Sequence, residues 1–89
     1  MDFKTSEAIQ GVLQSVLDLQ TEDLNYSFYY FANSGALSVS QYNEDHEEIW
    51  HRKVYVAEIG GYDNLIGLSM ELDAKLEEAQ NYIGEMIGE

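Results

Sequence analysis

The chain lacks cysteine and proline and has few basic residues. The absence of cysteine excludes disulfides and thiolate metal sites and points away from an oxidising compartment. Without proline, no helix or strand has to end at a pyrrolidine ring. No stretch approaches the ~18 apolar residues of a membrane span, and Met1–Glu7 has neither the basic start nor the apolar run of a signal peptide. These absences predict a cytoplasmic protein that does not bind membranes.

The shortage of basic residues leaves a strongly acidic chain. Four lysines and arginines stand against 17 aspartates and glutamates in 89 residues, for a formal net charge of −13 at pH 7. Such a surface repels nucleic acid and anionic lipid and favours a basic partner. Hydrophobic residues make up 45% of the chain, too many for an acidic disordered tail. The length and this apolar content predict a single domain over residues 1–89.

Two segments have the period of amphipathic helices. Between Ser6 and Leu19 the apolar residues form one stripe, which Thr5 or Ser6 can cap: Ile9, Val12, Leu13, Val16 and Leu17. A longer helix is expected from Asp63, as its cap, to about Ile87. Its apolar seam consists of Leu65, Leu68, Leu72, Leu76, Ala79, Ile83 and Met86. At ~1.5 Å per residue this helix is close to 40 Å long, so we expect it to extend beyond the sheet.

Three segments between the helices read as strands. Residues 24–31 are dense in aromatic side chains, residues 36–42 alternate, and Asn33–Gly35 is a turn signal. The third strand is expected over 49–59, with Trp50 and Val54 on one face and Lys53 and Tyr55 on the other. The prediction is an α+β fold: an N-terminal helix, a three-stranded antiparallel meander, and a long C-terminal helix packed on the sheet.

The register of the first hairpin stays open. A three-residue loop places Leu37 and Val39 on the face of Tyr29 and Phe31. A two- or four-residue loop places Leu37 and Val39 instead on the face of Phe28 and Tyr30. In either register, aromatic side chains remain on the other face of the first strand.

Acidic residues form the first candidate site. A loop cluster and a column with seven-residue spacing on the last helix are candidates to contact a basic partner: Glu44, Asp45, Glu47 and Glu48, and Glu71, Glu78 and Glu85. Glu22–Asp23 is a third cluster, and Lys75 is placed to pair with Glu71. One interpretation is that the carboxylates mimic DNA phosphates; the other is a solvated surface that keeps the protein soluble.

Tyrosines form the second candidate site. Tyr29, Tyr42 and Tyr55 lie on three strands that we expect to be adjacent. Two helices on one face of the sheet would leave the other face open, and exposed tyrosine is favoured at protein interfaces. Stacking on single-stranded nucleic acid is disfavoured by the net charge. The alternative is that these side chains belong to the core.

Catalysis and cofactor binding have no sequence support. The chain has no glycine-rich phosphate loop, nucleophile elbow or metalloprotease motif. His46 lies among acids, but consecutive loop residues lack the alternating ligands of a calcium loop. We therefore expect a protein that is not an enzyme and has no cofactor or metal.

The segment Asn33–Tyr42, together with the aromatic strand before it and the leucine-spaced helix after it, carries a resemblance. From Tyr26 to about Ile83 the chain resembles small accessory proteins of phages and mobile elements of Gram-positive bacteria. By size, charge and architecture it is also analogous to anti-CRISPR inhibitors. The resemblance implies a phage or mobile-element origin. The analogy, together with the acidic surface, leads to the first hypothesis: a phage protein that inhibits a host defence nuclease, or another host protein that handles nucleic acid, by binding its basic groove.

A second hypothesis is a self-associating accessory module. It would form a homodimer through the leucine seam of the last helix or through the tyrosine-rich face of the sheet. A third, a module that binds a small ligand, needs a pocket that the sequence does not reveal.

Overall fold

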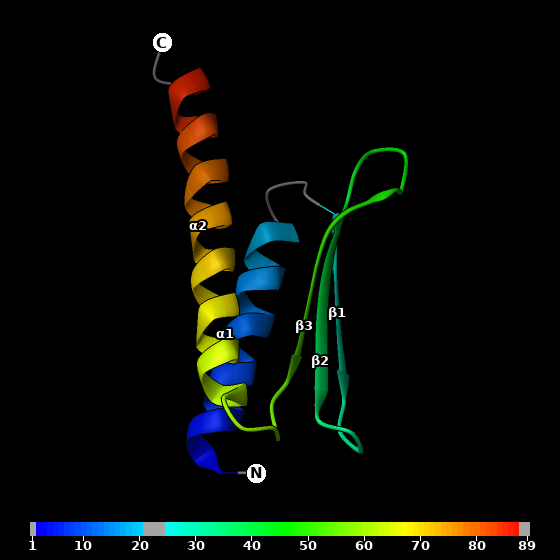
Figure 1. Cartoon of the computed structure of the whole chain (residues 1–89). Coiled ribbons are helices and arrows are strands. Elements are labelled where there is room, and N and C mark those ends of the chain that lie inside the picture. The colour runs from blue at the N-terminus through cyan, green and yellow to red at the C-terminus, as the bar shows by residue number, and fades with distance from the viewer. Residues whose placement is uncertain (1, 21–24, 88–89) are drawn as a thin grey trace.

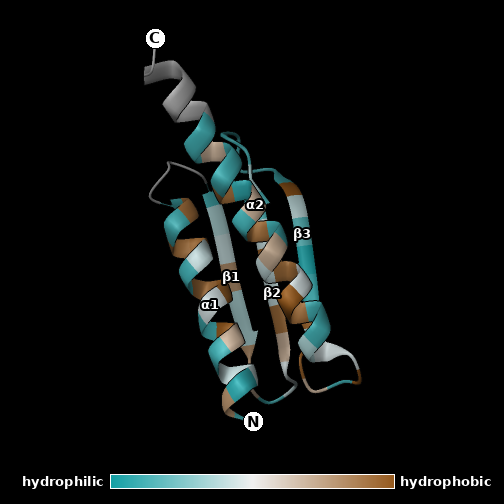
Figure 2. Cartoon of the chain, turned by 90° about the vertical axis from the view of Figure 1, so that its left-hand side faces the viewer, coloured by the Kyte–Doolittle hydropathy of each residue, from teal (hydrophilic) through white to brown (hydrophobic). Residues whose placement is uncertain are grey.

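The computed structural model describes the backbone of residues 2–20 and 25–87 and the side chains of residues 2–20 and 25–81. The elements, in chain order, are α1 (Phe3–Gln20), β1 (Asn25–Phe31), β2 (Ala36–Tyr42), β3 (Glu48–Tyr55) and α2 (Gly61–Ile87). The strands form one antiparallel sheet in the order β1-β2-β3. Both helices lie side by side on the same face of the sheet (Figures 1 and 2). The predicted α+β architecture is confirmed.

Both predicted helix caps are wrong. Helix α1 begins at Phe3, because the Asp2 carboxylate accepts a 2.7 Å hydrogen bond from the Thr5 N–H and so acts as the cap. That hydrogen bond also holds the pKa of Asp2 below its usual value. Helix α2 begins at Gly61, which places Asp63 inside the first turn. There its carboxylate lies at the positive end of the helix dipole.

The first hairpin adopts the register of a four-residue loop. Phe31 pairs with Ala36, so Leu37 and Val39 lie opposite Tyr30 and Phe28 on the face that the helices cover. Gly35, the last loop residue, has a φ of 70°, a conformation in which a side chain is disfavoured. Tyr29 and Phe31 are therefore on the uncovered face of the sheet.

Strand β3 is shorter than predicted. It ends at Tyr55 rather than Ile59, because Tyr55 pairs with Ala36, the first residue of β2. Beyond that point the Val56 N–H bonds to the Gly35 carbonyl and the chain turns toward α2. The predicted start of the first strand at Leu24 lies outside the described residues.

The core lies between the helices and the sheet. Its largest fully buried side chains come from both helices and from β2: Leu19, Leu37, Leu65, Leu72, Val12 and Val39. The α2 seam thus packs against the protein itself at Leu65, Leu68 and Leu72, while Ile83 and Met86 lie beyond the described side chains. On α1 the predicted stripe is partly wrong. Leu13 and Leu17 are exposed, because the buried face is centred on Val12, Val16 and Leu19.

Candidate functional site: an acidic end and an uncovered sheet face

The acidic loop between β2 and β3 is a short turn built around Asn43. The Asn43 side-chain oxygen accepts hydrogen bonds from the Asp45 and Glu47 N–H groups, both at 2.9 Å. His46 completes the turn with a φ of 64°. The Glu44, Asp45 and Glu47 side chains are exposed. The turn is thus held by hydrogen bonds from its backbone N–H groups to the Asn43 side chain.

Acids from distant parts of the sequence lie toward the same end of the molecule. The β2–β3 loop, the last turn of α1 and the second half of α2 all lie at the end away from the N-terminus (Figure 1). The segments at this acidic end contain Asp18, the loop acids Glu44, Asp45 and Glu47, and the α2 acids Glu77 and Glu78. The sequence showed separate clusters, and only the antiparallel path of the chain brings them together.

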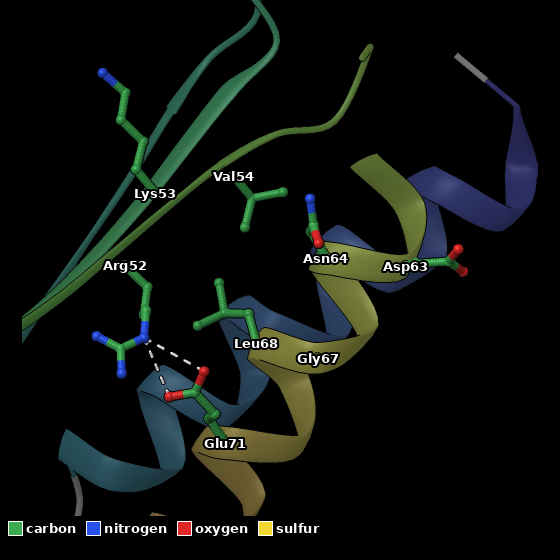
Figure 3. Close-up of a pocket in the computed structure, with 8 residues that line it drawn as sticks. All are labelled: Arg52, Lys53, Val54, Asp63, Asn64, Gly67, Leu68 and Glu71. Atoms are coloured by element: carbon green, nitrogen blue, oxygen red, sulfur yellow. Dashed lines mark hydrogen bonds and ion pairs between the residues drawn. The ribbon is translucent and has the colours of Figure 1, made fainter. Parts of the chain in front are cut away.

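The predicted column on α2 is not uniform. Glu71 lies toward the first half of the helix, where its carboxylate pairs with the Arg52 guanidinium at 3.2 Å (Figure 3). Glu78 is exposed at the acidic end, and the Glu85 side chain lies outside the described residues. Lys75 does not make the predicted pair with Glu71. It donates to the Gln41 side chain and lies 4.6 Å from the centre of the Trp50 ring.

Glu48 belongs to a polar cluster rather than to the free loop. Ser40 donates to the Glu48 carboxylate at 2.7 Å, and the Ser40 oxygen lies 2.9 Å from Nδ1 of His51. Nδ1 is also 3.3 Å from the same carboxylate. Sequence reasoning missed this cluster. The feature that would have indicated this cluster is the β2–β3 register, which places Ser40 opposite His51.

This serine–histidine–glutamate cluster does not have the geometry of a hydrolase triad. In a triad, one imidazole nitrogen faces the serine and the other faces the carboxylate. Here Nδ1 faces both groups, and the Ser40 hydroxyl donates to Glu48 instead of to the imidazole. Ser40 is also only 5% exposed. The cluster ties β2 to β3 on the uncovered face.

Aromatic side chains mark the other half of that face. Tyr29 and Phe31 stack with ring centres 6.3 Å apart, and Lys53 lies 5.2 Å from the centre of the Tyr55 ring. Tyr29 is 58% exposed and Tyr55 is 41% exposed. Tyr42 is half-buried at the opposite end of the strands, where its hydroxyl accepts a bond from Ser27. The structure therefore places Tyr29 and Tyr55 at the same end of the sheet and separates Tyr42 from them.

A shallow groove of about 290 Å³ lies between β3 and α2, where the Arg52–Glu71 pair and Leu68 line it (Figure 3). Within the described part of the chain, no three histidine, aspartate or glutamate side chains are grouped to hold a metal ion. Over the same residues, neither helix is long and apolar enough to cross a membrane.

Comparison of the chain with family models, curated proteins and solved structures gives no match.

Proposed function

We propose that this protein is a non-enzymatic inhibitor whose acidic end binds the basic groove of a host protein that handles nucleic acid. The gathering of loop and helix carboxylates at one end is the observation that carries the proposal. The loop acids Glu44, Asp45 and Glu47 are exposed on a turn that the Asn43 side chain holds in place. A fixed set of carboxylates resembles the phosphates that a basic groove normally binds.

The positions of the basic side chains support the same proposal. Each of the four lysines and arginines lies over an aromatic ring: Lys4 over Tyr62, Arg52 and Lys75 over Trp50, and Lys53 over Tyr55. Arg52 also pairs with Glu71, between β3 and α2. The loop carboxylates therefore remain available to lysines and arginines of a partner.

The experiment compares two matched variants with the wild type. The loop variant replaces Glu44, Asp45 and Glu47 by their amides. Glu48 is left intact because it holds Ser40. The control variant replaces Glu7, Glu58 and Asp63 by their amides, which removes the same charge from exposed residues away from the acidic end.

Each protein is immobilised and exposed to nuclease-treated lysate of a Gram-positive host, and a captured protein is then assayed for displacement of its DNA or RNA. We expect wild type and control to capture one nucleic-acid-binding protein and block its binding at ~0.1 M salt, and to release it at ~0.5 M salt. The loop variant should bind at least ~10-fold more weakly. Equal capture and displacement by the loop variant would remove the acidic end from the mechanism.

A further inference from the structure

The negative charge is absent from one side of the molecule. Residues 8–17 and 25–42 contain no charged side chain, in a chain whose formal net charge is −13. These segments form most of α1, all of β1 and all of β2. Because β1 is an edge strand and α1 packs over it, the side of the fold formed by α1 and β1 has a largely uncharged surface.

The α1 part of this surface is apolar. Ser15 bonds to Asp73 of α2 at 3.1 Å, so it marks the side of α1 that faces α2. Leu13 and Leu17 lie about 200° around the helix from Ser15, on the side beyond the edge of the sheet. They are 39% and 51% exposed. We call this strip the Leu13–Leu17 flank.

The β1 part is a free sheet edge without the usual protection. The Tyr26 N–H donates to the Gln20 side chain at 2.8 Å rather than to β2, so it points outward. Since backbone groups alternate along a strand, those of Phe28 and Tyr30 also point outward. Natural edges carry charges, proline or bulges that oppose pairing. The other edge, β3, has Arg52, Lys53 and a register shift at Gln41/Tyr42, whereas β1 has none of these.

We propose that this side binds a second copy of the chain, through antiparallel pairing of the two β1 strands and contact between the two Leu13–Leu17 flanks. Pairing centred on Phe28 places Tyr26 opposite Tyr30 of the second copy and matches the outward-pointing residues of both strands. The full length of β1, from Asn25 to Phe31, then pairs once the Tyr26 N–H leaves the Gln20 side chain.

Among the possible dimers of this chain, electrostatics favours this arrangement. Two chains of charge −13 repel, so a stable contact must bring uncharged surfaces together. The two-fold axis at Phe28 also turns the copies end to end. Their acidic ends therefore lie at opposite ends of the dimer, as far apart as this sheet allows. The proposal is independent of what the acidic end binds.

The test is sedimentation of the wild type and two double variants over ~10–500 µM, in ~0.3 M salt to screen general repulsion. The first variant is Leu13→Lys with Leu17→Lys. The control is Ile59→Lys with Met70→Lys, which changes the net charge by the same amount at exposed apolar residues elsewhere. Both lower the overall repulsion between chains, so lost dimerisation in the first variant would come from the flank itself.

We expect the wild type and the control to dimerise and the flank variant to dimerise at least ~10-fold more weakly. Amide hydrogen exchange, followed by NMR, should be slower for Phe28 and Tyr30 at high protein concentration than after dilution. A monomeric wild type would overturn the proposal. So would a dimer that both variants weaken equally, a dimer that the flank variant leaves intact, or Phe28 and Tyr30 exchange that is independent of concentration.

Discussion

At the scale of single residues, Tyr26 combines burial with a nearby charge. Its side chain is 8% exposed, and its ring packs edge-on against Trp50 with centres 6.5 Å apart. Burial, with a smaller contribution from the Glu78 carboxylate, raises the pKa of Tyr26 to about 12. The neutral phenol is thus favoured in the folded protein, which couples this one hydroxyl to stability at alkaline pH.

Replacing Tyr26 by Phe should make unfolding less dependent on alkaline pH. The folded pKa lies above the unfolded value of about 10, so the contribution of Tyr26 is complete below pH ~10 and is lost as pH rises toward ~12. The loss amounts to about 2 kcal/mol. Urea unfolding at pH ~8 and ~11.5 measures it, with Tyr29→Phe as the exposed control. Equal pH dependence in wild type and Tyr26→Phe would contradict the assignment.

At the scale of elements, the junction between β3 and α2 depends on a close backbone approach. A Cβ at Gly61 would lie 2.5 Å from the Tyr55 carbonyl oxygen and 2.7 Å from that of Val56. The helix can therefore start directly under the end of the strand only with glycine at this position. Gly67, two turns later in the same helix, has nothing within 4 Å of the same virtual atom.

Replacing these two glycines by alanine should have opposite effects on the free energy of unfolding. Gly61→Ala forces the backbone of β3 and α2 apart and is expected to lower the free energy of unfolding by about 1–3 kcal/mol. Gly67→Ala removes only the flexibility of glycine and should raise it by about 0.5–1 kcal/mol. Chemical denaturation of both variants checks the prediction. A Gly61→Ala protein as stable as wild type would show that the junction relaxes without cost.

At the scale of the whole molecule, charge is distributed unevenly. The acidic end gathers carboxylates from α1, the β2–β3 loop and α2, whereas the α1–β1 side carries almost no charge. The same chain can therefore repel copies of itself at one surface and associate at another. Proximity of like charges at the acidic end also lowers the stability of the monomer.

Salt should therefore stabilise the protein, and the loop should account for much of the effect. Raising salt from ~0.02 to ~0.5 M is expected to increase the free energy of unfolding by roughly 1 kcal/mol. The loop amide variant should be more stable than wild type at low salt, by more than the control amide variant. Thermal unfolding of dilute protein measures this. A melting temperature that falls with added salt would contradict the prediction.

Local patterns in the sequence were sufficient for the elements but not for their ends. The 3.6-residue period in both helices and the aromatic strand identified the α+β order correctly. The caps were wrong because the Asp2 carboxylate caps α1 earlier than expected, and because the close backbone approach at Gly61 starts α2 before Asp63. The stripe on α1 was wrong at Leu13 and Leu17, because the position of β1 and α2 decides which part of an apolar face is covered.

For the candidate sites too, local sequence determined some features and the tertiary structure determined others. The charge of −13 and the acidic loop follow from residue types, which are local properties, whereas the exposure of Tyr29 depends on the register of the first hairpin. The pairing of Glu71 with Arg52, the role of Glu48 beside Ser40, and the separation of Tyr42 from Tyr55 depend on strand register and helix placement.

The sequence by itself determined the net charge, the number and order of the elements, and which strand is rich in aromatic residues, because each is a property of residues close together in the chain. Only the tertiary structure decided that three acidic segments share one end and that an uncharged helix flank lies beside an unprotected sheet edge. The first arrangement joins segments far apart in sequence, because the antiparallel path returns the chain repeatedly to the same two ends. The second depends on the strand order, which puts β1 at the edge of the sheet, and on the packing of α1 over it.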